Sequence, residues 1–273
     1  MLLAIDFGIS NTDIIVNDGK EYKFFSHPTS KKIDERFLEK IFSYIDLSAD
    51  KFSLIGVTGG KSSDLSDKYL NIKILKVNEV DAIAMGAKSI FKIKDGLPFI
   101  AVSAGTGTAC IYNDNGVTTH LGGISVGGGT LQGLSKKLLN EDSSGILEKL
   151  SLAGNRKNLD SLIGEVVNDI GALHPEVTAS NFEKARYSDD HSDSDIAASL
   201  SNMVGEIIGT VSYLNALLMG VSEVFFIGRV GNLEVVRSGI TDRLALANIK
   251  GNFDSQSGFG NALGVMFFLN KES

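Results

Sequence analysis

Short apolar runs alternate with turn residues at the N-terminus, which is the pattern of β-strands joined by tight turns. The expected strands are residues 2–6, 12–16 and 21–25. Because the turns between them are short, consecutive strands pair antiparallel and form a meander. Apolar positions three and four residues apart then predict a helix over residues 33–44. Strands over 52–57 and 71–77 and a helix over 81–91 complete this part of the chain.

The same pattern starts again near residue 99. Strands are expected at 99–103, 108–112 and 117–120, and Asn115-Gly116 is a strong hairpin turn. Helices over 130–139, 144–152, 195–219, 233–247 and 260–269 and a buried strand over 223–227 follow, while residues 155–193 are polar and irregular. The repetition predicts a duplicated α/β unit with a cleft between two lobes. The lobes are expected to be residues 1–97 and residues 98–273, the second with a helical insertion.

Composition narrows the class of protein. The chain has 273 residues with 33 acidic and 26 basic side chains, a formal charge of −7, and no cluster of Lys and Arg. Nucleic acid and anionic membrane surfaces are therefore poor partners. A single cysteine, Cys110, and an N-terminus without signal-peptide character favour a cytoplasmic protein. The most apolar stretch, 207–222, is too short and too polar to span a bilayer.

Glycines gather at positions where backbone would approach an anion. The chain has 30 glycines and 3 prolines. Asp6 ends the first expected strand and is followed by a hairpin tip that contains Gly8, Ser10 and Asn11. Backbone N–H groups of such a tip would face a phosphate, and the aspartate would hold a Mg²⁺-bound water. An ordinary turn with a local side-chain hydrogen bond has the same sequence character.

Two further glycine clusters belong to the second meander. Gly105, Thr106 and Gly107 form its first hairpin tip, so the two tips would face one cleft from opposite sides. Gly127, Gly128 and Gly129 lead through Thr130 into a helix, where free N–H groups and the positive end of the helix dipole favour an anion. The chain has no Gly-x-x-x-x-Gly-Lys-Ser/Thr loop, no strand–Gly-x-Gly-x-x-Gly–helix unit and no metal-type His/Cys spacing.

The expected strand 223–227 ends at Gly228, followed by Arg229. A glycine at a strand end lets a flat ring approach the backbone, although a simple strand cap looks the same. Glu79 lies near the start of an expected helix, where a glutamate also stabilises the helix dipole.

Taken in order along the chain, these motifs resemble the actin-like ATPase superfamily and, more narrowly, the type II pantothenate kinases. The motifs are Asp6-Phe7-Gly8, Glu79-Val80-Asp81, Gly105-Thr106-Gly107-Thr108, the run from Gly123 to Thr130, and Gly228 after a strand. The resemblance implies a duplicated ribonuclease H-like fold with an interlobe nucleotide cleft, ATP and Mg²⁺ as cofactors, and a homodimer. It also implies phosphorylation of the primary hydroxyl of pantothenate, the first step of coenzyme A biosynthesis.

The resemblance also implies a role for individual residues. Glu79 would be the catalytic base, and Asp6 would hold Mg²⁺ through water. Thr106, His120 and Ser125 would bind the acceptor substrate. The nucleotide would be bound by Asp6, Gly8, Ser10, Asn11, Gly105, Thr106, Gly107, Gly127, Gly128, Gly129, Thr130, Gly228 and Arg229.

Two positions depart from the family pattern. Asp13 stands where the family has a lysine that contacts ATP phosphates, and His120 stands where it has an arginine for the substrate carboxylate. A carboxylate reverses the local charge, and histidine is a weaker anion partner than a guanidinium. Lys61 and Arg229 are candidates to compensate, although either would also serve as a surface cation.

Three interpretations of the departures stay open. The first is a pantothenate kinase, the second a relative that phosphorylates another small alcohol such as pantetheine or an amino sugar, and the third a nucleotide-binding regulator without kinase activity. The opening residues also resemble type III pantothenate kinases, but the triple glycine before a helix argues against that group.

Overall fold

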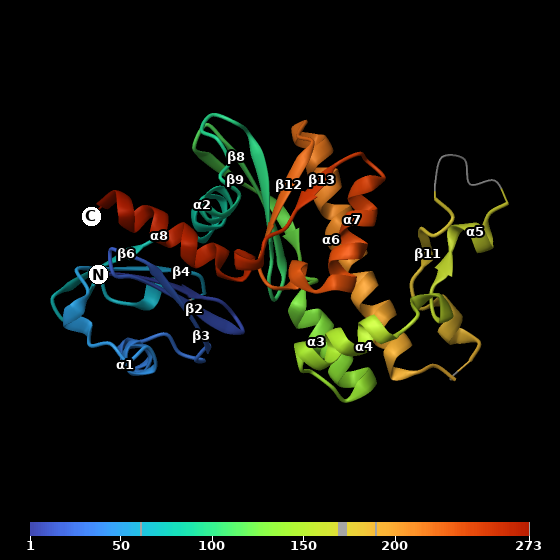
Figure 1. Ribbon diagram of the computed structural model, residues 1–273, viewed down its shortest axis with the longest axis horizontal. Helices are drawn as coiled ribbons and strands as arrows, with labels where there is room; N and C mark the ends of the chain where they lie inside the picture. Colours follow the sequence, from blue (N-terminus) through green and yellow to red (C-terminus); the bar gives the residue numbers. More distant parts are fainter. Residues whose placement is uncertain (61, 169–173, 189, 273) are drawn as a thin grey trace.

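Two mixed β-sheets organise the chain, and each forms the centre of one lobe (Figure 1). The computed structural model describes residues 1–60, 62–168, 174–188 and 190–272. The six-stranded sheet has the order β3-β2-β1-β4-β6-β5, and the five-stranded sheet has the order β13-β12-β7-β8-β9. In both sheets an antiparallel meander (β1–β3, β7–β9) continues into parallel strands (β4 and β6, β12 and β13). The predicted duplicated α/β fold is confirmed.

The strand bounds extend most predicted strands by a few residues. The strands are β1 (Leu2–Phe7), β2 (Asn11–Asn17), β3 (Tyr22–Pro28), β4 (Leu54–Thr58), β5 (Lys68–Tyr69), β6 (Ile72–Lys76), β7 (Phe99–Ala104), β8 (Thr108–Asp114), β9 (Val117–Ile124), β10 (Ser161–Leu162), β11 (Thr178–Ser180), β12 (Glu223–Ile227) and β13 (Lys250–Asn252). The short strands β5, β10, β11 and β13 were not predicted because two or three residues carry no readable alternation.

The predicted helices are present with shifted ends. They are α1 (Glu35–Tyr44), α2 (Glu79–Phe91), α3 (Gly128–Leu139), α4 (Ser144–Ala153), α6 (Asp193–Met219), α7 (Glu234–Ala245) and α8 (Gly260–Glu272), with a short unpredicted α5 (Ile163–Val166). Helix α2 begins two residues before the predicted start because the Asn78 side chain caps it by accepting a hydrogen bond from the Val80 N–H. The segment with α5 and β11 lies at the far end of the second lobe (Figure 1).

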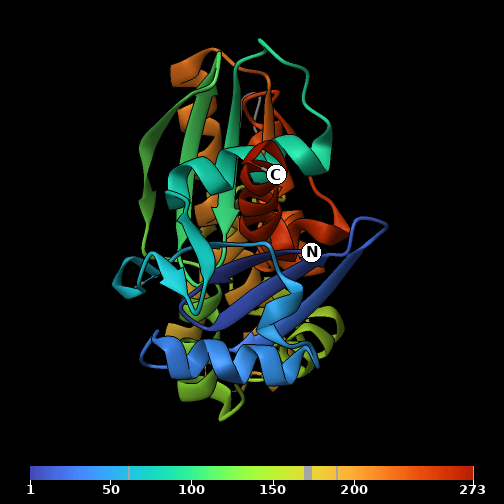
Figure 2. The same ribbon diagram turned by 90° about the vertical axis from the view of Figure 1, so that its left-hand side faces the viewer.

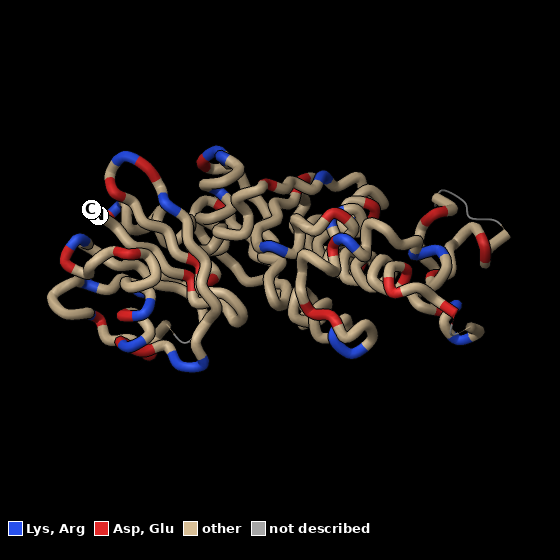
Figure 3. Tube along the Cα trace, turned by 60° about the horizontal axis from the view of Figure 1, so that its bottom comes forward, with Lys and Arg blue, Asp and Glu red and all other residues tan. Residues whose placement is uncertain are grey.

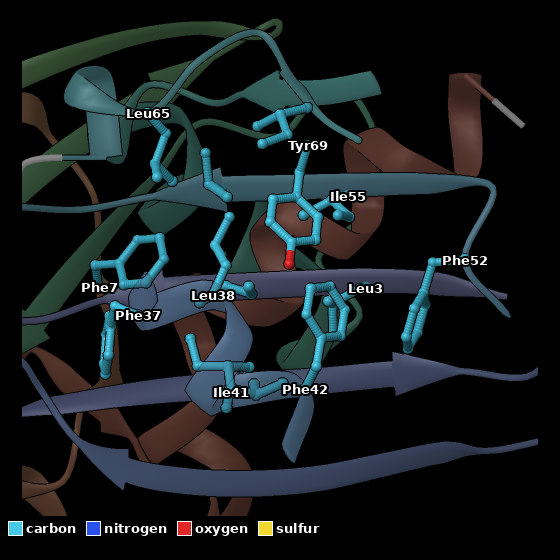
Figure 4. Close-up of a cluster of buried hydrophobic side chains, with 14 of the residues drawn as sticks. Leu3, Phe7, Phe37, Leu38, Ile41, Phe42, Phe52, Ile55, Leu65 and Tyr69 are labelled. Carbon is cyan, nitrogen blue, oxygen red and sulfur yellow. The ribbon is translucent and has the colours of Figure 1, made fainter. Parts of the chain in front are cut away.

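Strand alternation gives the first sheet two buried faces. Leu3, Ile5 and Phe7 of β1 point to one face, where they join a core with Phe37 and Leu38 of α1 (Figure 4). The intervening residues of β1 point to the other face, where Leu2 and Ala4 pack against Ala262, Leu263 and Val265 of α8. Asp6 continues this second series, so its side chain faces the side that α8 covers.

Two helices are exchanged between the lobes. Helix α8, the last element, packs on the first sheet, while α2, which follows the first sheet in sequence, packs on β7 and β12 of the second (Figures 1 and 2). The strands of the first sheet end with β6 at Lys76 and those of the second begin with β7 at Phe99, but α8 contacts the lobe formed by residues 1–97. A division of the chain into independent domains at this point stays a proposal.

Helices α2 and α8 cross with their backbones in contact. A Cβ atom on Gly86 would overlap the carbonyl oxygen of Gly260, and one on Gly264 would overlap that of Ala82. Helix α2 packs on the second sheet and α8 on the first, so the distance between the two helix axes fixes the distance between the lobes.

None of the described helices has the length and apolar character needed to cross a membrane. Lys and Arg positions are interspersed with Asp and Glu positions along both lobes (Figure 3).

The crossing of α2 and α8 predicts a cost for any side chain at Gly264. We expect Gly264→Ala to lower the free energy of unfolding by about 1–3 kcal/mol, because backbone atoms of Ala82 would have to move. Thermal unfolding measures the change. The matched control is Gly133→Ala in α3, where a Cβ atom meets nothing within 4 Å and alanine favours the helix. Equal melting temperatures for the two variants would contradict this packing.

Candidate active site

The ends of β1, β7 and β12 and the glycine-rich hairpin tips line a cavity of about 710 Å³ between the lobes. Most residues singled out from the sequence line it, namely Asp6, Gly8, Ser10, Asn11, Glu79, Gly105, Thr106, Gly107, His120, Ser125, Gly128, Gly129, Gly228 and Arg229. Gly127 and Thr130 are not part of the lining. Lys61 lies outside the described residues. The structure thus brings most of the candidate residues together, although they come from distant parts of the sequence.

Asp6 is a buried acid at the end of β1. Its side chain faces the second sheet surface, and its Oδ1 atom has no hydrogen-bond partner among the described residues. Burial raises the pKa of the Asp6 carboxyl well above its usual range, and the negative charges of Asp13 and Glu79 add to the rise. A hydrogen bond with Asn261 and the charge of Arg229 oppose it. An unpartnered, buried carboxylate oxygen at a cavity wall fits a cation or its bound water.

Asp13 lies directly opposite Asp6 in the antiparallel β1–β2 pair, so the two carboxylates are neighbours on one sheet face. Arg229 approaches from the second lobe and binds Asp13 through both terminal nitrogens, with Nη1 2.8 Å from Oδ2 and Nη2 donating to Oδ1. The sequence interpretation gave Arg229 as one candidate to compensate the negative charge of Asp13. The structure shows a direct ion pair between the two, in which a bidentate guanidinium matches the carboxylate.

The triple glycine before α3 packs against the second hairpin tip. The N–H groups of Gly128 and Gly129 donate to the carbonyl oxygens of Gly105 and Thr106, at 2.8 and 3.0 Å. A Cβ atom on Gly127 would lie 2.7 Å from the Gly105 oxygen. The expectation that Gly128 and Gly129 leave free N–H groups is therefore wrong. The glycines let the helix N-terminus clamp the second hairpin tip and hold its shape.

The two hairpin tips meet across the cavity. Ser10 Oγ and Thr106 Oγ1 lie 3.0 Å apart and form a hydrogen bond between the lobes. Both tips also line the cavity, so this contact bounds the cavity between them. The predicted arrangement of opposed tips corresponds to this geometry.

Glu79 is the first residue of α2, is exposed and lines the cavity. Its charge is close enough to Asp6 to raise the pKa of that carboxyl. His120 and Ser125 belong to β9 and the loop after it, are both exposed, and line the same cavity.

Two residues near Arg229 and Asp6 were not identified as site residues. Asn261, in the first turn of α8, lines the cavity and lies close enough to Asp6 to oppose the rise in the pKa of that carboxyl. The carbonyl oxygen of Ser257 accepts from the Gly228 N–H at 2.7 Å and so fixes the end of β12. Their position depends on α8 crossing to the first sheet, which no local pattern in the sequence reveals.

In the described parts of the chain, no three His, Cys, Asp or Glu side chains gather into a cluster that would enclose an ion. Asp6 with its unpartnered oxygen is the residue present that fits a hydrated divalent cation.

A protein-family model and a curated relative both match most of the second lobe of this chain or more. The family model described as Fumble matches residues 91–235. The type II pantothenate kinase of Bacillus thuringiensis subsp. konkukian is 35% identical over 240 residues, which are 83% of this chain and 82% of that protein.

Solved structures share the fold at low identity. The activator of the 2-hydroxyisocaproyl-CoA dehydratase from Clostridium difficile with bound ADPNP has a TM-score of 0.66 and 17% identity, covering 99% of this chain and 94% of that one. A ROK family glucokinase from Streptomyces griseus in complex with glucose and AMPPNP has a TM-score of 0.63 and 12% identity, covering 98% of each chain.

Because the pKa of Asp6 is raised, replacing Asp6 by the neutral asparagine is expected to stabilise the protein by an amount that depends on pH. When folding raises the pKa of a carboxyl above its usual value of about 4, the folded state is destabilised at a pH where the unfolded chain would ionise that group. Below that value the group is protonated in both states, and the cost disappears. We expect Asp6→Asn, without nucleotide and with a chelator, to melt at a higher temperature than the parent at pH 7.5, and the difference to shrink toward pH 4.5. Each kcal/mol of relief raises the melting temperature by roughly 2–4 °C in a chain of this size.

Asp18→Asn is the contrasting control, because backbone hydrogen bonds from Lys20 and Glu21 lower the pKa of the half-buried Asp18. That substitution is expected to lower the melting temperature slightly at pH 7.5. A loss of stability in Asp6→Asn that is the same at both pH values would contradict a strained, buried charge at Asp6.

Proposed function

The chain belongs to the type II pantothenate kinases of the Fumble family, and from this membership we propose that it transfers the γ-phosphoryl group of ATP to the primary hydroxyl of pantothenate. This transfer is the first step of coenzyme A biosynthesis. The observation that carries the proposal is the interlobe cavity, where the carboxylates of Asp6 and Glu79 and two glycine-rich hairpin tips line one space. Phosphoryl transfer needs mainly positioning and charge neutralisation. The tips would position the phosphates, and Asp6 would hold the cation that neutralises their charge.

ATP would lie between the tips, with its phosphates near Gly8, Ser10 and Asn11 on one side and Gly105–Gly107 on the other. Gly128 and Gly129 line the cavity and also hold the second tip through their N–H groups, and Gly127 packs against that tip without lining the cavity. Thr130 lies outside the lining and donates to the carbonyl oxygen of Ser125. Gly228 has a φ of +92°, and its backbone packs against Ala104, which leaves the cavity wall there without a side chain. Such a wall suits the flat part of a nucleotide.

Asp6 would hold Mg²⁺ through a water molecule, and the ion would reduce the negative charge on the phosphates. This role is compatible with the burial of Asp6, because a nearby cation favours its charged form.

Glu79 would act as the general base that takes the proton of the attacking hydroxyl. It is exposed to the cavity, and its place at the start of α2 fixes the direction from which it approaches. A carboxylate within hydrogen-bond reach of the acceptor hydroxyl orients that hydroxyl as well as deprotonating it.

The acceptor would bind beside Thr106, His120 and Ser125, which line the cavity. His120 would contact the carboxylate of pantothenate as a hydrogen-bond donor. The regulator without kinase activity was favoured by a negative charge facing the phosphates, and the Asp13–Arg229 pair removes that argument.

The remaining expectations also belong to this proposal. We infer a cytoplasmic homodimer that acts on a small molecule and binds no nucleic acid. The exposed side chains of Leu214, Leu217 and Leu218 on α6 are the candidate dimer surface. The charge of −7 disfavours polyanions.

A coupled ADP-release assay with MgATP tests the proposed reaction, with pantothenate, pantetheine and a panel of sugars as acceptors. We expect turnover with pantothenate that falls about 10²–10⁴-fold in Glu79→Gln, because an amide does not accept the proton. Binding of ATP to this variant is expected to persist.

Glu35→Gln is the matched control, because Glu35 is also the first residue of a helix and exposed, but lies outside the cavity lining. Its turnover should equal that of the parent. Absence of turnover with pantothenate, or full activity in Glu79→Gln, would overturn the assigned substrate or base, respectively.

His120→Arg tests the acceptor contact separately. A guanidinium binds a carboxylate with two hydrogen bonds and a permanent charge, so we expect the KM for pantothenate to fall several-fold with little change in the KM for ATP. Steady-state kinetics with pantothenate and with pantetheine, which has no carboxylate, measure the effect. An equal change for both acceptors would show that position 120 does not recognise the carboxylate.

A further inference from the structure

Arg229 is the one Lys or Arg side chain among the described residues that line the interlobe cavity. The same lining contains three carboxylates, those of Asp6, Asp13 and Glu79. A triphosphate entering this cavity therefore meets a surface with an excess of negative charge and a single fixed cation. The placement of that cation decides whether the described surface attracts or repels the phosphates.

The guanidinium of Arg229 is held from several sides. Nη1 and Nη2 bind the two oxygens of Asp13, Nη2 also donates to Ser26 Oγ at 3.1 Å, and the guanidinium carbon lies 5.6 Å from the ring centre of Phe259. The hydrogen bond to Asp13 raises the pKa of Arg229, so its charge is permanent. A long flexible side chain is thereby reduced to one orientation.

This arrangement leaves part of the guanidinium available. An arginine has five N–H donors, and the bonds to Asp13 and Ser26 use three of them. The donor at Nε and one at Nη1 have no partner within the described portions of the chain. The Arg229 side chain is 43% exposed, whereas that of Asp13 is 6% exposed. The buried acid thus anchors a cation that still faces the cavity.

We propose that Arg229 is the cation that binds the nucleotide phosphates in this cavity and that Asp13 is its positioning residue. The inference rests on the proposed kinase function for its ligand and adds Asp13 to the site. Asp13 itself does not touch the nucleotide. It fixes the guanidinium, which crosses from the second lobe to the first, so the phosphates would be bound in the closed arrangement of the lobes.

An alternative role for the pair is a brace that holds the lobes together without contacting the nucleotide. The two roles differ in what a relocated charge does. A lysine at position 13 would extend from β2 about as far as the Asp13 carboxylate and its bound guanidinium together. The double substitution Asp13→Lys/Arg229→Gln therefore moves the cation from the second lobe to the first and removes the ion pair. Asp13→Arg with Arg229→Asp keeps an ion pair and reverses its direction.

Calorimetric titration of the full chain with MgAMPPNP and with adenosine tests the proposal. We expect Arg229→Gln to weaken AMPPNP binding roughly 10- to 100-fold, the loss typical of a charge-assisted contact, and adenosine binding less than about twofold. Asp13→Asn should weaken AMPPNP binding roughly 3- to 10-fold and raise the KM for ATP without changing the KM for pantothenate. Asp13→Lys/Arg229→Gln should recover most of the affinity lost in Arg229→Gln.

A brace gives a different set of results. Recovery in Asp13→Arg/Arg229→Asp but none in Asp13→Lys/Arg229→Gln would overturn the proposal, as would an equal loss of adenosine and AMPPNP affinity in Arg229→Gln. Arg229→Lys keeps the charge and loses the bidentate contact, so we expect it to bind AMPPNP more weakly than the parent and more tightly than Arg229→Gln. Where Arg229→Gln proves unstable, Arg229→Lys still shows whether the bidentate contact matters for AMPPNP. If the parent binds AMPPNP but does not phosphorylate pantothenate, the proposed function fails and these binding experiments still decide the role of Asp13.

Discussion

Two carboxylates that face each other on neighbouring strands set the main constraint on this structure. Asp6 and Asp13 are directly opposed in the β1–β2 pair, and both are largely buried. Like charges in this position repel, and burial removes the water that would screen them. Arg229 relieves the repulsion from the opposite lobe through its ion pair with Asp13. The charge balance of the cavity therefore depends on this cross-lobe ion pair.

The fold brings that contact about through two exchanged helices. Helix α8 crosses to the first sheet and supplies Asn261 to Asp6, while α2 crosses to the second and supplies Glu79 to the cavity. Glycines at the crossing of α2 and α8 allow the backbones to touch, so the lobes are joined at a fixed distance. The hairpin tips meet again at Ser10 and Thr106. The cavity is thus bounded by contacts formed within the protein itself.

Local patterns in the sequence were sufficient for the longer strands of both sheets, and most of the residues that they singled out line the cavity. Both meanders were visible as apolar runs between turns, and Gly8, Gly105 and Gly228 were assigned to the cleft because each follows a strand. The N–H groups of Gly128 and Gly129 were expected to be free, and only the structure shows that they donate to the carbonyl oxygens of Gly105 and Thr106. The Asp13–Arg229 pair joins residues 216 positions apart, and no periodicity in one sequence encodes such a contact. The packing of α8 on the first sheet was missed for the same reason.

A crystal structure of the protein with MgAMPPNP tests most directly whether this cross-lobe cation serves the nucleotide. We expect an Arg229 nitrogen within hydrogen-bond distance of a phosphate oxygen while Nη1 and Nη2 stay bound to Asp13. We also expect the bound metal near Asp6, with water between the ion and the carboxylate. A nucleotide bound in the cavity with its phosphates away from Arg229, or with the Asp13–Arg229 pair broken, would contradict the role assigned to the pair.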